Sequence, residues 1–291
     1  MKQLLSFFLF GLVTVSAQNA FQVVHRESKK PVAYANIWLV ENNFGTSTNQ
    51  NGLFELPNIS QTDTLVIDVV GFERKLIASN QLTNPIVLFP NEESKELMRV
   101  PKVKILQRNA TYQPQQVYLN PGIPYMFSKF FPNKDLQQTG TMLKKVRIKL
   151  NNRQARSKFL MRFYEVDENS KPIKLIHQSP ILVEVKESNV LEIEVDVKNI
   201  GIKIPKNGVL IALETIVLPE NKLEWKGTEY GTNITLQRVE YQPNFRFEPT
   251  NSTNTWLYSN GKWNLFHHDN QMMDKKAYPY VQIDVSISVT K

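Results

Sequence analysis

The chain has 291 residues, enough for two domains with sizeable cores, and carries a formal net charge of +8. It contains no cysteine, which excludes disulfides, thiolate metal sites, a cysteine nucleophile and a lipoprotein anchor. Lys and Arg are scattered among Glu and Asp rather than clustered. This favours solubility over nucleic-acid binding, with weak attraction to anionic envelope polymers as the alternative.

The first residues have the pattern of a secretory leader. Lys2 supplies the positive charge, Leu4–Val15 is an apolar core too short to span a bilayer, and Val15-Ser16-Ala17 is a small-residue cleavage site. We expect a signal peptide at residues 1–17 and an exported mature chain from Gln18, located in the periplasm, on the outer-membrane surface or outside the cell. No later stretch is apolar enough to predict a transmembrane segment.

Residues 18–90 carry short apolar runs separated by turn residues. Ala35–Val40 forms one such run, and Leu65, Ile67 and Val69 alternate at the period of a strand. Asn51-Gly52 predicts a β-hairpin with a type I′ turn, because both central residues of that turn need a positive φ. The pattern predicts a small β-sandwich.

This stretch resembles a known family through three segments. Pro31–Leu39, Gly45–Leu56 and Asp63–Glu73 match the pattern of the carboxypeptidase-regulatory-like domain, although Ala20-Phe21 stands where the family usually has a glycine. The resemblance implies a transthyretin-like sandwich of the kind found in secreted and envelope proteins of Bacteroidetes-type bacteria. It implies no catalytic residue, because the family takes its name from sitting beside a peptidase.

The charged, proline-bounded residues 91–102 are expected to be a linker, followed by a second domain at residues 103–291. Alternating apolar residues in Val146–Leu150, Phe159–Phe163, Leu191–Val197 and Val281–Val289 predict half-buried strands. Val209–Leu213 is apolar throughout and predicts a central strand, whereas Asn260-Gly261 predicts a hairpin. The fold class is therefore all-β, with a jelly-roll-like sandwich as the larger domain.

A second resemblance concerns Lys144–Ile216. This segment is similar to a β-sandwich that often follows the first domain in envelope proteins, and its expected shape is that of carbohydrate-binding jelly rolls. No ligand residue is defined for that likeness, so it assigns none here.

The sequence lacks the motifs of common enzymes. None of His25, His177, His267 and His268 is followed three residues later by Glu, so the zinc-peptidase motif is absent. There is no nucleophile elbow, phosphate-binding loop or dinucleotide fingerprint. Glu192, Glu194 and Asp196 are interpreted as a strand's solvated face rather than as catalytic carboxylates. We expect no catalytic residue and no cofactor.

Two sets of residues are candidate binding sites. His267, His268 and Asp269, with Asp274 nearby, could hold calcium or zinc from a loop, although a plain loop is favoured. Trp225, Tyr230, Trp256 and Trp263 could stack against sugar rings if exposed. Alternatively, Trp256 and Trp263 pack across a hairpin as part of the core.

These observations predict a non-catalytic exported envelope protein that acts as an accessory or binding module, by shape or strand addition. The expected partner is an envelope protein or polysaccharide, not a nucleic acid. The alternatives are a carbohydrate-binding module that uses the tryptophans and a hydrolase with an unrecognised site.

Overall fold

The computed structural model describes residues 19–41, 44–56, 59–91, 97–100, 102–108, 122–133, 141–228, 233–252, 255–266 and 280–290. Its elements are β-strands and short 3-10 turns, as the sequence predicted. Within these residues, no helix is long and apolar enough to cross a membrane.

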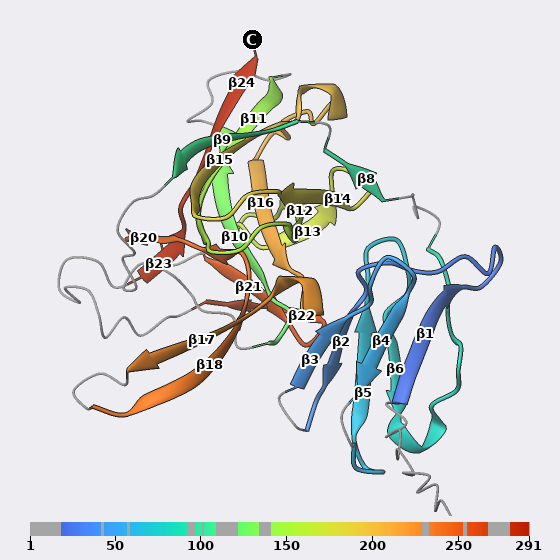
Figure 1. The fold of residues 1–291 in the computed structure, drawn as a ribbon. Coiled ribbons are helices and arrows are strands. Elements are labelled where there is room, and N and C mark those ends of the chain that lie inside the picture. Colours follow the sequence, from blue (N-terminus) through green and yellow to red (C-terminus); the bar gives the residue numbers. More distant parts are fainter. Residues whose placement is uncertain are drawn as a thin grey trace, which may run out of the picture.

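The N-terminal part is a sandwich of two small sheets (Figure 1). One sheet has the order β4-β1-β7 and the other β3-β2-β5-β6. Their facing side chains form one core that includes Val23, Ile37, Phe54 and Ile67. The strands are β1 (Asn19–His25), β2 (Asn36–Leu39), β3 (Phe44–Ser47), β4 (Leu53–Leu56), β5 (Thr64–Asp68), β6 (Lys75–Ala78) and β7 (Ile86–Leu88), with a 3-10 turn at Ser79–Gln81.

The hairpin predicted at Asn51-Gly52 is wrong. β3 pairs with β2 and β4 pairs with β1, so the turn between them carries the chain from one sheet to the other. Gly52 has a positive φ of 70°, but Asn51 does not belong to the residues with positive φ. The glycine is needed because a Cβ there would lie 2.5 Å from the carbonyl oxygen of Val23.

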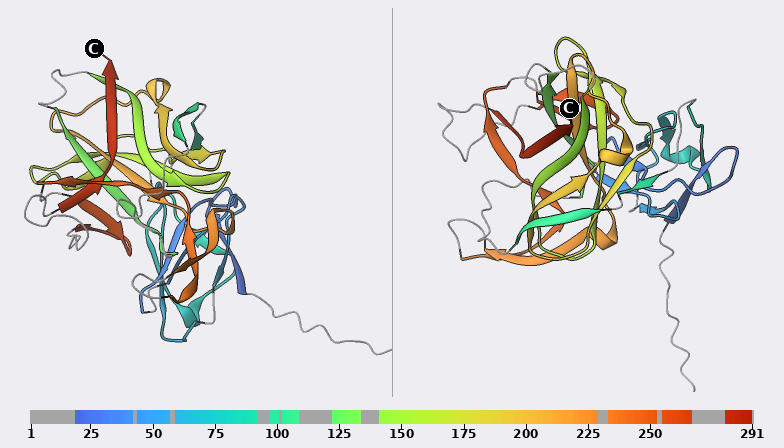
Figure 2. Two further views of the ribbon diagram at one scale, coloured as in Figure 1. Left: turned by 60° about the vertical axis from the view of Figure 1, so that its left-hand side comes forward. Right: turned by 90° about the horizontal axis from the view of Figure 1, so that it is seen from above.

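The C-terminal part is a larger sandwich of two main sheets (Figure 2). Its first strands are β8 (Met98–Arg99), β9 (Val103–Arg108), β10 (Met126–Pro132), β11 (Met142–Asn152), β12 (Ser157–Val166), β13 (Pro172–Leu175), β14 (Ile181–Val185), β15 (Val190–Asp196) and β16 (Gly208–Thr215). They are followed by β17 (Lys222–Thr228), β18 (Thr235–Tyr241), β19 (Asn244–Phe245), β20 (Phe247–Thr250), β21 (Trp256–Ser259), β22 (Lys262–Leu265), β23 (Tyr280–Ile283) and β24 (Val285–Thr290). Short 3-10 turns lie at Lys198–Ile200 and Pro219–Asn221.

The strands of this sandwich are shared between two sheets, and the chain crosses from one to the other several times. The larger sheet runs β22-β21-β10-β16-β12-β14-β8, with β13 added to β12. The other sheet runs β19-β11-β15-β9, with β24 on β11. The strands β12, β13 and β14 follow one another in the larger sheet, and the late strand β16 is inserted between the early strands β10 and β12. Closing two sheets over each other in this way buries one continuous core, which confirms the predicted fold class.

The strands β12 and β16 are buried on both faces. Their inner residues, such as Phe163 and Ile211, lie in the main core. Their outer residues, such as Leu160 and Ala212, belong to separate clusters on the other side of the sheet. Every residue of β16 is buried, so the prediction of a central strand at Val209–Leu213 is confirmed.

The N-terminal sandwich covers part of that outer face. Trp38 Nε1 donates to the carbonyl of Pro124 over 3.0 Å, and Tyr258 donates its hydroxyl to Asp68 over 2.8 Å. Ser47 and Val217 exchange two hydrogen bonds of 3.0 Å each, one from each backbone N–H. This explains why the short strand β2 is buried along its whole length.

At the centre of this contact lies a charged group from the C-terminal sheet. The Arg162 guanidinium pairs with the Glu214 carboxylate, and the Asn36 side-chain amide of the N-terminal sandwich donates to the same carboxylate. The Arg162 and Glu214 side chains are 3% and 2% exposed. The two sandwiches are therefore joined through a paired, water-excluded network.

Two predicted strand patterns need correction. The alternating run Val281–Val289 was predicted as one strand but is interrupted at Asp284. On either side of it, β23 pairs with β20 and β24 pairs with β11. The expected solvated face of β15 is covered at Glu194, whose side chain is 7% exposed because Lys145 and Arg147 of β11 both bind its carboxylate. The hairpin at Asn260-Gly261 is confirmed, since both residues have positive φ and join β21 to β22.

Candidate binding groove

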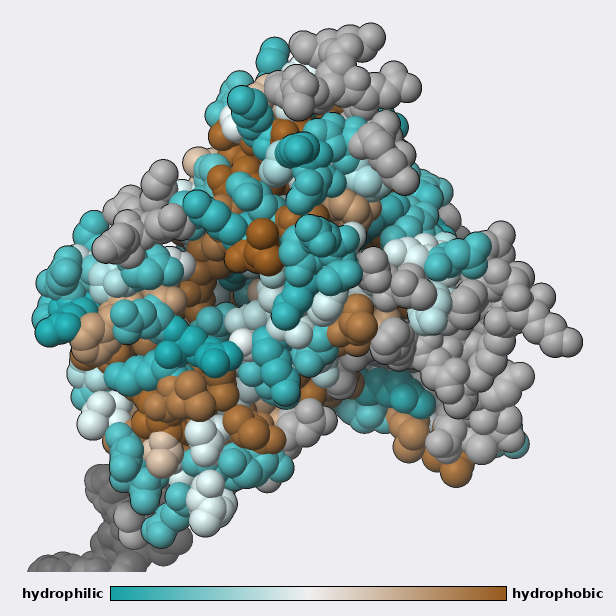
Figure 3. Space-filling model, turned by 180° about the vertical axis from the view of Figure 1, so that it is seen from behind, coloured by the Kyte–Doolittle hydropathy of each residue, from teal (hydrophilic) through white to brown (hydrophobic). Residues whose placement is uncertain are grey.

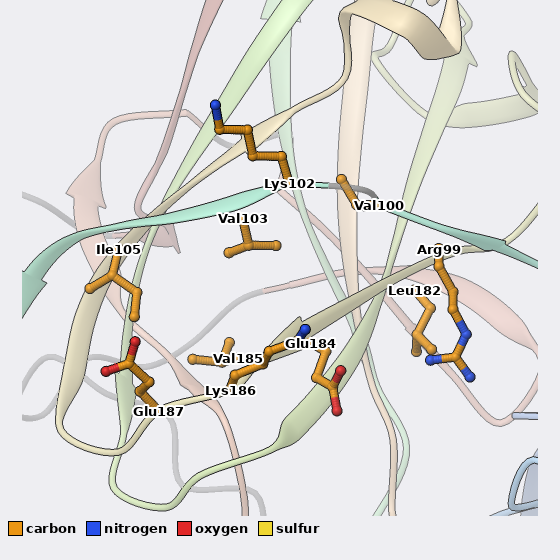
Figure 4. Close-up of a pocket in the computed structure, with 10 residues that line it drawn as sticks. All are labelled: Arg99, Val100, Lys102, Val103, Ile105, Leu182, Glu184, Val185, Lys186 and Glu187. Atoms are coloured by element: carbon orange, nitrogen blue, oxygen red, sulfur yellow. The ribbon is translucent and has the colours of Figure 1, made fainter.

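A groove lies at one side of the C-terminal sandwich, where the edges of its two sheets come close (Figure 4). The strand β14 belongs to the larger sheet and β9 to the other sheet. Val100 and Lys102, which stand between β8 and β9, bound one end. The groove has a volume of about 410 Å³, which is within the range of ligand sites.

The edge of β14 is only partly paired. The strand β8 runs parallel to it, and the N–H groups of Met98 and Val100 donate to the carbonyls of Pro180 and Leu182. Backbone groups of alternate strand residues point to the same side, so Glu184 also directs its N–H and C=O towards this edge. Beyond Val100, no described residue pairs with that edge, so the backbone of Glu184 has no partner there among the described residues.

The edge of β9 has the same property. Its residues pair with β15, and the N–H of Asp196 donates to the carbonyl of Lys102. By the same alternation, Val103 and Ile105 direct their backbone groups away from β15. Among the described residues, no strand is paired with this outer edge. The groove is thus bordered by two strand edges that can accept hydrogen bonds from, and donate them to, an extended chain.

The floor is apolar and the rim is charged. Val103 and Val185 face each other across the groove, and Ile105 lies beside them (Figure 4). Val185 belongs to the main core, and Val103 and Ile105 pack against it. The rim carries both signs of charge, namely Arg99, Lys102, Glu184, Lys186 and Glu187. An apolar floor, charged rim and open edges are the features of a site for an extended peptide.

Several ionisable groups with raised pKa values lie away from the groove, at the contact between the sandwiches. Burial raises the pKa of Asp68, although the hydroxyl of Tyr258 counteracts the shift by donating to this carboxylate. Burial likewise raises the pKa of Tyr258 itself, and the charge of Asp68 adds to the rise. Burial is also the main cause of a raised pKa at Glu214, against the opposing charge of Arg162. Because these groups are enclosed and bound to each other, their arrangement holds the two sandwiches together.

The tryptophans proposed for sugar binding fall into two separate places. Trp256 and Trp263 lie on the hairpin β21–β22 and pack on the outer face of the larger sheet. The Trp263 ring makes edge-to-face contacts with Tyr164 and Tyr258, at 5.4 and 5.2 Å between ring centroids. Both indoles are half-buried, so the packing alternative accounts for these contacts.

Trp225 lies on the hairpin β17–β18, which forms a sheet of its own. The Arg153 guanidinium stands 4.8 Å from its ring centroid, and the ring lies against Gly227, where a Cβ would come within 2.4 Å of it. Tyr230 is outside the described residues. Sugar binding by these aromatics stays a prediction.

The predicted metal ligands His267, His268 and Asp269 also lie outside the described residues. Within the described part of the chain, no group of three or more His, Cys, Asp or Glu side chains is placed to hold a metal ion.

Sequence patterns do not reveal the groove, because its walls come from segments that are distant in the sequence. Arg99, Val100 and Lys102 fall in the predicted linker, whereas Val185 ends β14 some 80 residues later and Lys186 follows it. The sequence does indicate one wall of the groove, since Val103 and Ile105 alternate with Lys102 and Lys104 as in an edge strand. The sequence did not show which strand would face it.

Comparison with known proteins identifies the first domain. A family model described as the CarboxypepD_reg-like domain matches residues 22–100, so the N-terminal sandwich is a CarboxypepD_reg-like domain. No curated protein and no solved structure matches the chain.

Proposed function

We propose that the protein is an exported, non-catalytic binding protein whose C-terminal sandwich takes up an extended segment of a partner protein. The segment would lie in the groove as an added strand on β14, in line with β8. The observation that carries this proposal is the open edge at Glu184, set above an apolar floor. Export is supported by the leader-like pattern of residues 1–17.

The strand β8 supports this mode of binding. It is a strand of two residues that already adds to β14 by backbone hydrogen bonds of 2.8 and 3.2 Å. A peptide that continued its line would meet the backbone groups of Glu184. Its inward side chains would contact Val103, Ile105 and Val185, because successive side chains of a strand point to opposite faces. Backbone pairing supplies affinity and the floor supplies selectivity.

The test is selection of random hexapeptides on the immobilised protein, followed by affinity measurement by fluorescence anisotropy. Ile105→Ala shortens a floor side chain and should weaken the selected peptides about tenfold, which corresponds to one buried side-chain contact. Ile173→Ala is the matched control, because Ile173 is 61% exposed on β13 and lines no part of the groove. It should leave affinity unchanged.

Hydrogen exchange tests the strand pairing directly. Binding should slow exchange of the backbone amide of Glu184, whose N–H faces the open edge in the free protein. The proposal is wrong if no hexapeptide binds, or if the peptides that bind protect other amides and are insensitive to Ile105→Ala. Thermal unfolding of each variant shows whether the fold is intact.

A further inference from the structure

The charges at the rim of the groove favour one chemical class of peptide. Of its acidic residues, Glu187 forms an ion pair with Arg108, so its charge is already compensated. Glu184 forms no ion pair among the described residues, but it points away from β9 (Figure 4) towards the outer face of the sheet, where Lys158 pairs with Glu220. These contacts leave little negative charge directed at the groove itself.

The basic residues of the rim are in a different situation. Arg99, Lys102 and Lys186 line the groove, and none of them forms an ion pair within the part of the chain that the structure describes. Arg99 and Lys102 stand at the end next to β8, and Lys186 follows directly after β14. In Figure 4 the Lys102 side chain rises from β9 and the Arg99 side chain, like that of Glu184, points away from β9, so these two basic groups flank the groove on its outer sides. The chain as a whole is basic as well.

We infer that the groove selects extended peptide segments in which acidic residues alternate with apolar ones. The inference rests on the proposed function, since it names the partner of the same groove. The apolar side chains would face Val103, Ile105 and Val185. The carboxylates, on the opposite face of the added strand or at its ends, would meet Arg99, Lys102 and Lys186. Lysine is also common at free strand edges, where its charge opposes unwanted pairing with other strands. Here the basic residues would repel basic segments and attract acidic ones.

Two synthetic peptides provide the test: acetyl-Val-Glu-Val-Glu-Val-amide and its counterpart with lysines in place of the glutamates. At low salt the protein should bind the acidic peptide about tenfold more tightly, as two favourable charge contacts at a partly exposed site would give. The preference should shrink as salt is added, because the rim is exposed.

The double variant Arg99→Glu/Lys186→Glu should reverse the preference. Its matched control is Lys174→Glu/Lys206→Glu, which changes the net charge by the same amount at two exposed residues that do not line the groove. The control should keep the preference for the acidic peptide. Persistence of that preference in Arg99→Glu/Lys186→Glu would overturn the inference, because the selectivity would then come from another surface.

The failure of this inference can be told apart from failure of the proposed function. If both peptides bind equally well and Ile105→Ala weakens both, the groove binds peptides but does not select their charge. If neither synthetic peptide binds but selected hexapeptides do, the inferred partner class is wrong. If no peptide of any kind binds, the proposed function itself is wrong.

Discussion

The larger sheet of the C-terminal sandwich meets its surroundings in two contrasting ways. Its outer face, around Arg162 and Glu214, is covered by the CarboxypepD_reg-like domain. The two charges pair with each other within the sheet, and Asn36 of that domain donates to the Glu214 carboxylate. Its edge at β14 is left partly open beyond β8, above an apolar floor. Both places combine apolar residues with charged ones. The difference is that the charged groups of the first are bound to partners within the chain, whereas the second leaves backbone groups and charges available to another molecule.

This contrast separates a structural contact from a binding surface. Buried charges that bind each other hold two domains in a fixed relation, and removal of one partner is costly because the other stays buried. Unpaired strand edges and rim charges remain hydrated in the free protein, so they are inexpensive to keep and can be used in binding.

Apolar side chains on the rear of the molecule form separate patches among hydrophilic ones (Figure 3), which leaves no single continuous apolar face in that view.

The largest expected effect is at the buried ion pair. Arg162→Met should lower the free energy of unfolding by about 3–5 kcal/mol, because it leaves the Glu214 carboxylate buried without its cation. Urea denaturation measures the change. Arg147→Met is the control: this residue also pairs with a glutamate, but its side chain is 56% exposed, so the loss should stay below about 1 kcal/mol.

The double variant Arg162→Met/Glu214→Leu sharpens the same comparison. It replaces both charges with apolar side chains of similar size and should recover much of the stability lost in Arg162→Met. Equal losses in Arg162→Met and Arg147→Met would mean that the domain contact is no more water-excluded than the sheet surface.

A smaller loss of folding stability is expected when the hydrogen bond between Tyr258 and Asp68 is removed. Tyr258→Phe removes the hydroxyl that donates to Asp68 and should destabilise the protein by about 1–2 kcal/mol, since a half-buried carboxylate loses a hydrogen-bond donor. Ile105→Ala offers the comparison at the groove. Peptide affinity should fall in Ile105→Ala and stay unchanged in Tyr258→Phe. This result would show that peptide binding depends on the groove and not on the contact between the domains.

The smallest effect concerns pH and distinguishes two carboxylates. Lys145 and Arg147 lower the pKa of Glu194 by hydrogen bonding, so the folded state releases its proton more readily than the unfolded state. The resulting stability is present above the ordinary glutamate pKa of 4.5 and is lost as pH falls through the lower, folded value. Between neutral and acidic pH, the free energy of unfolding should therefore change less with pH for Glu194→Gln than for the unaltered protein.

Asp68 should behave in the opposite sense. Burial raises its pKa, so the folded state binds a proton more readily, and stability falls as pH rises from the ordinary value of 3.8 towards the raised one. Asp68→Asn should remove that part of the pH dependence. If Asp68→Asn and Glu194→Gln changed the curve in the same direction, the opposite pKa shifts of these two carboxylates would be wrong.

Much of the architecture followed from local pattern. The period-two runs predicted the strands β12 and β15, and an uninterrupted apolar run predicted β16. The segments Pro31–Leu39, Gly45–Leu56 and Asp63–Glu73 pointed to the family of the first domain. These features depend on which side chains are buried, and the order of apolar and polar residues along a short segment is enough to indicate that. The hairpin at Asn260-Gly261 followed in the same way, since both residues tolerate a positive φ.

The tertiary structure decided everything that depended on partners distant in the sequence. Asn51-Gly52 has the residues of a hairpin turn, yet the two strands beside it join different sheets because each finds a better partner elsewhere. Glu194 belongs to a polar alternation but is buried by two basic side chains from β11. The groove between β9 and β14 exists only because two sheet edges converge. Sequence periodicity sets which face of a strand is apolar, and only the packing of the whole chain sets what that face or edge will meet.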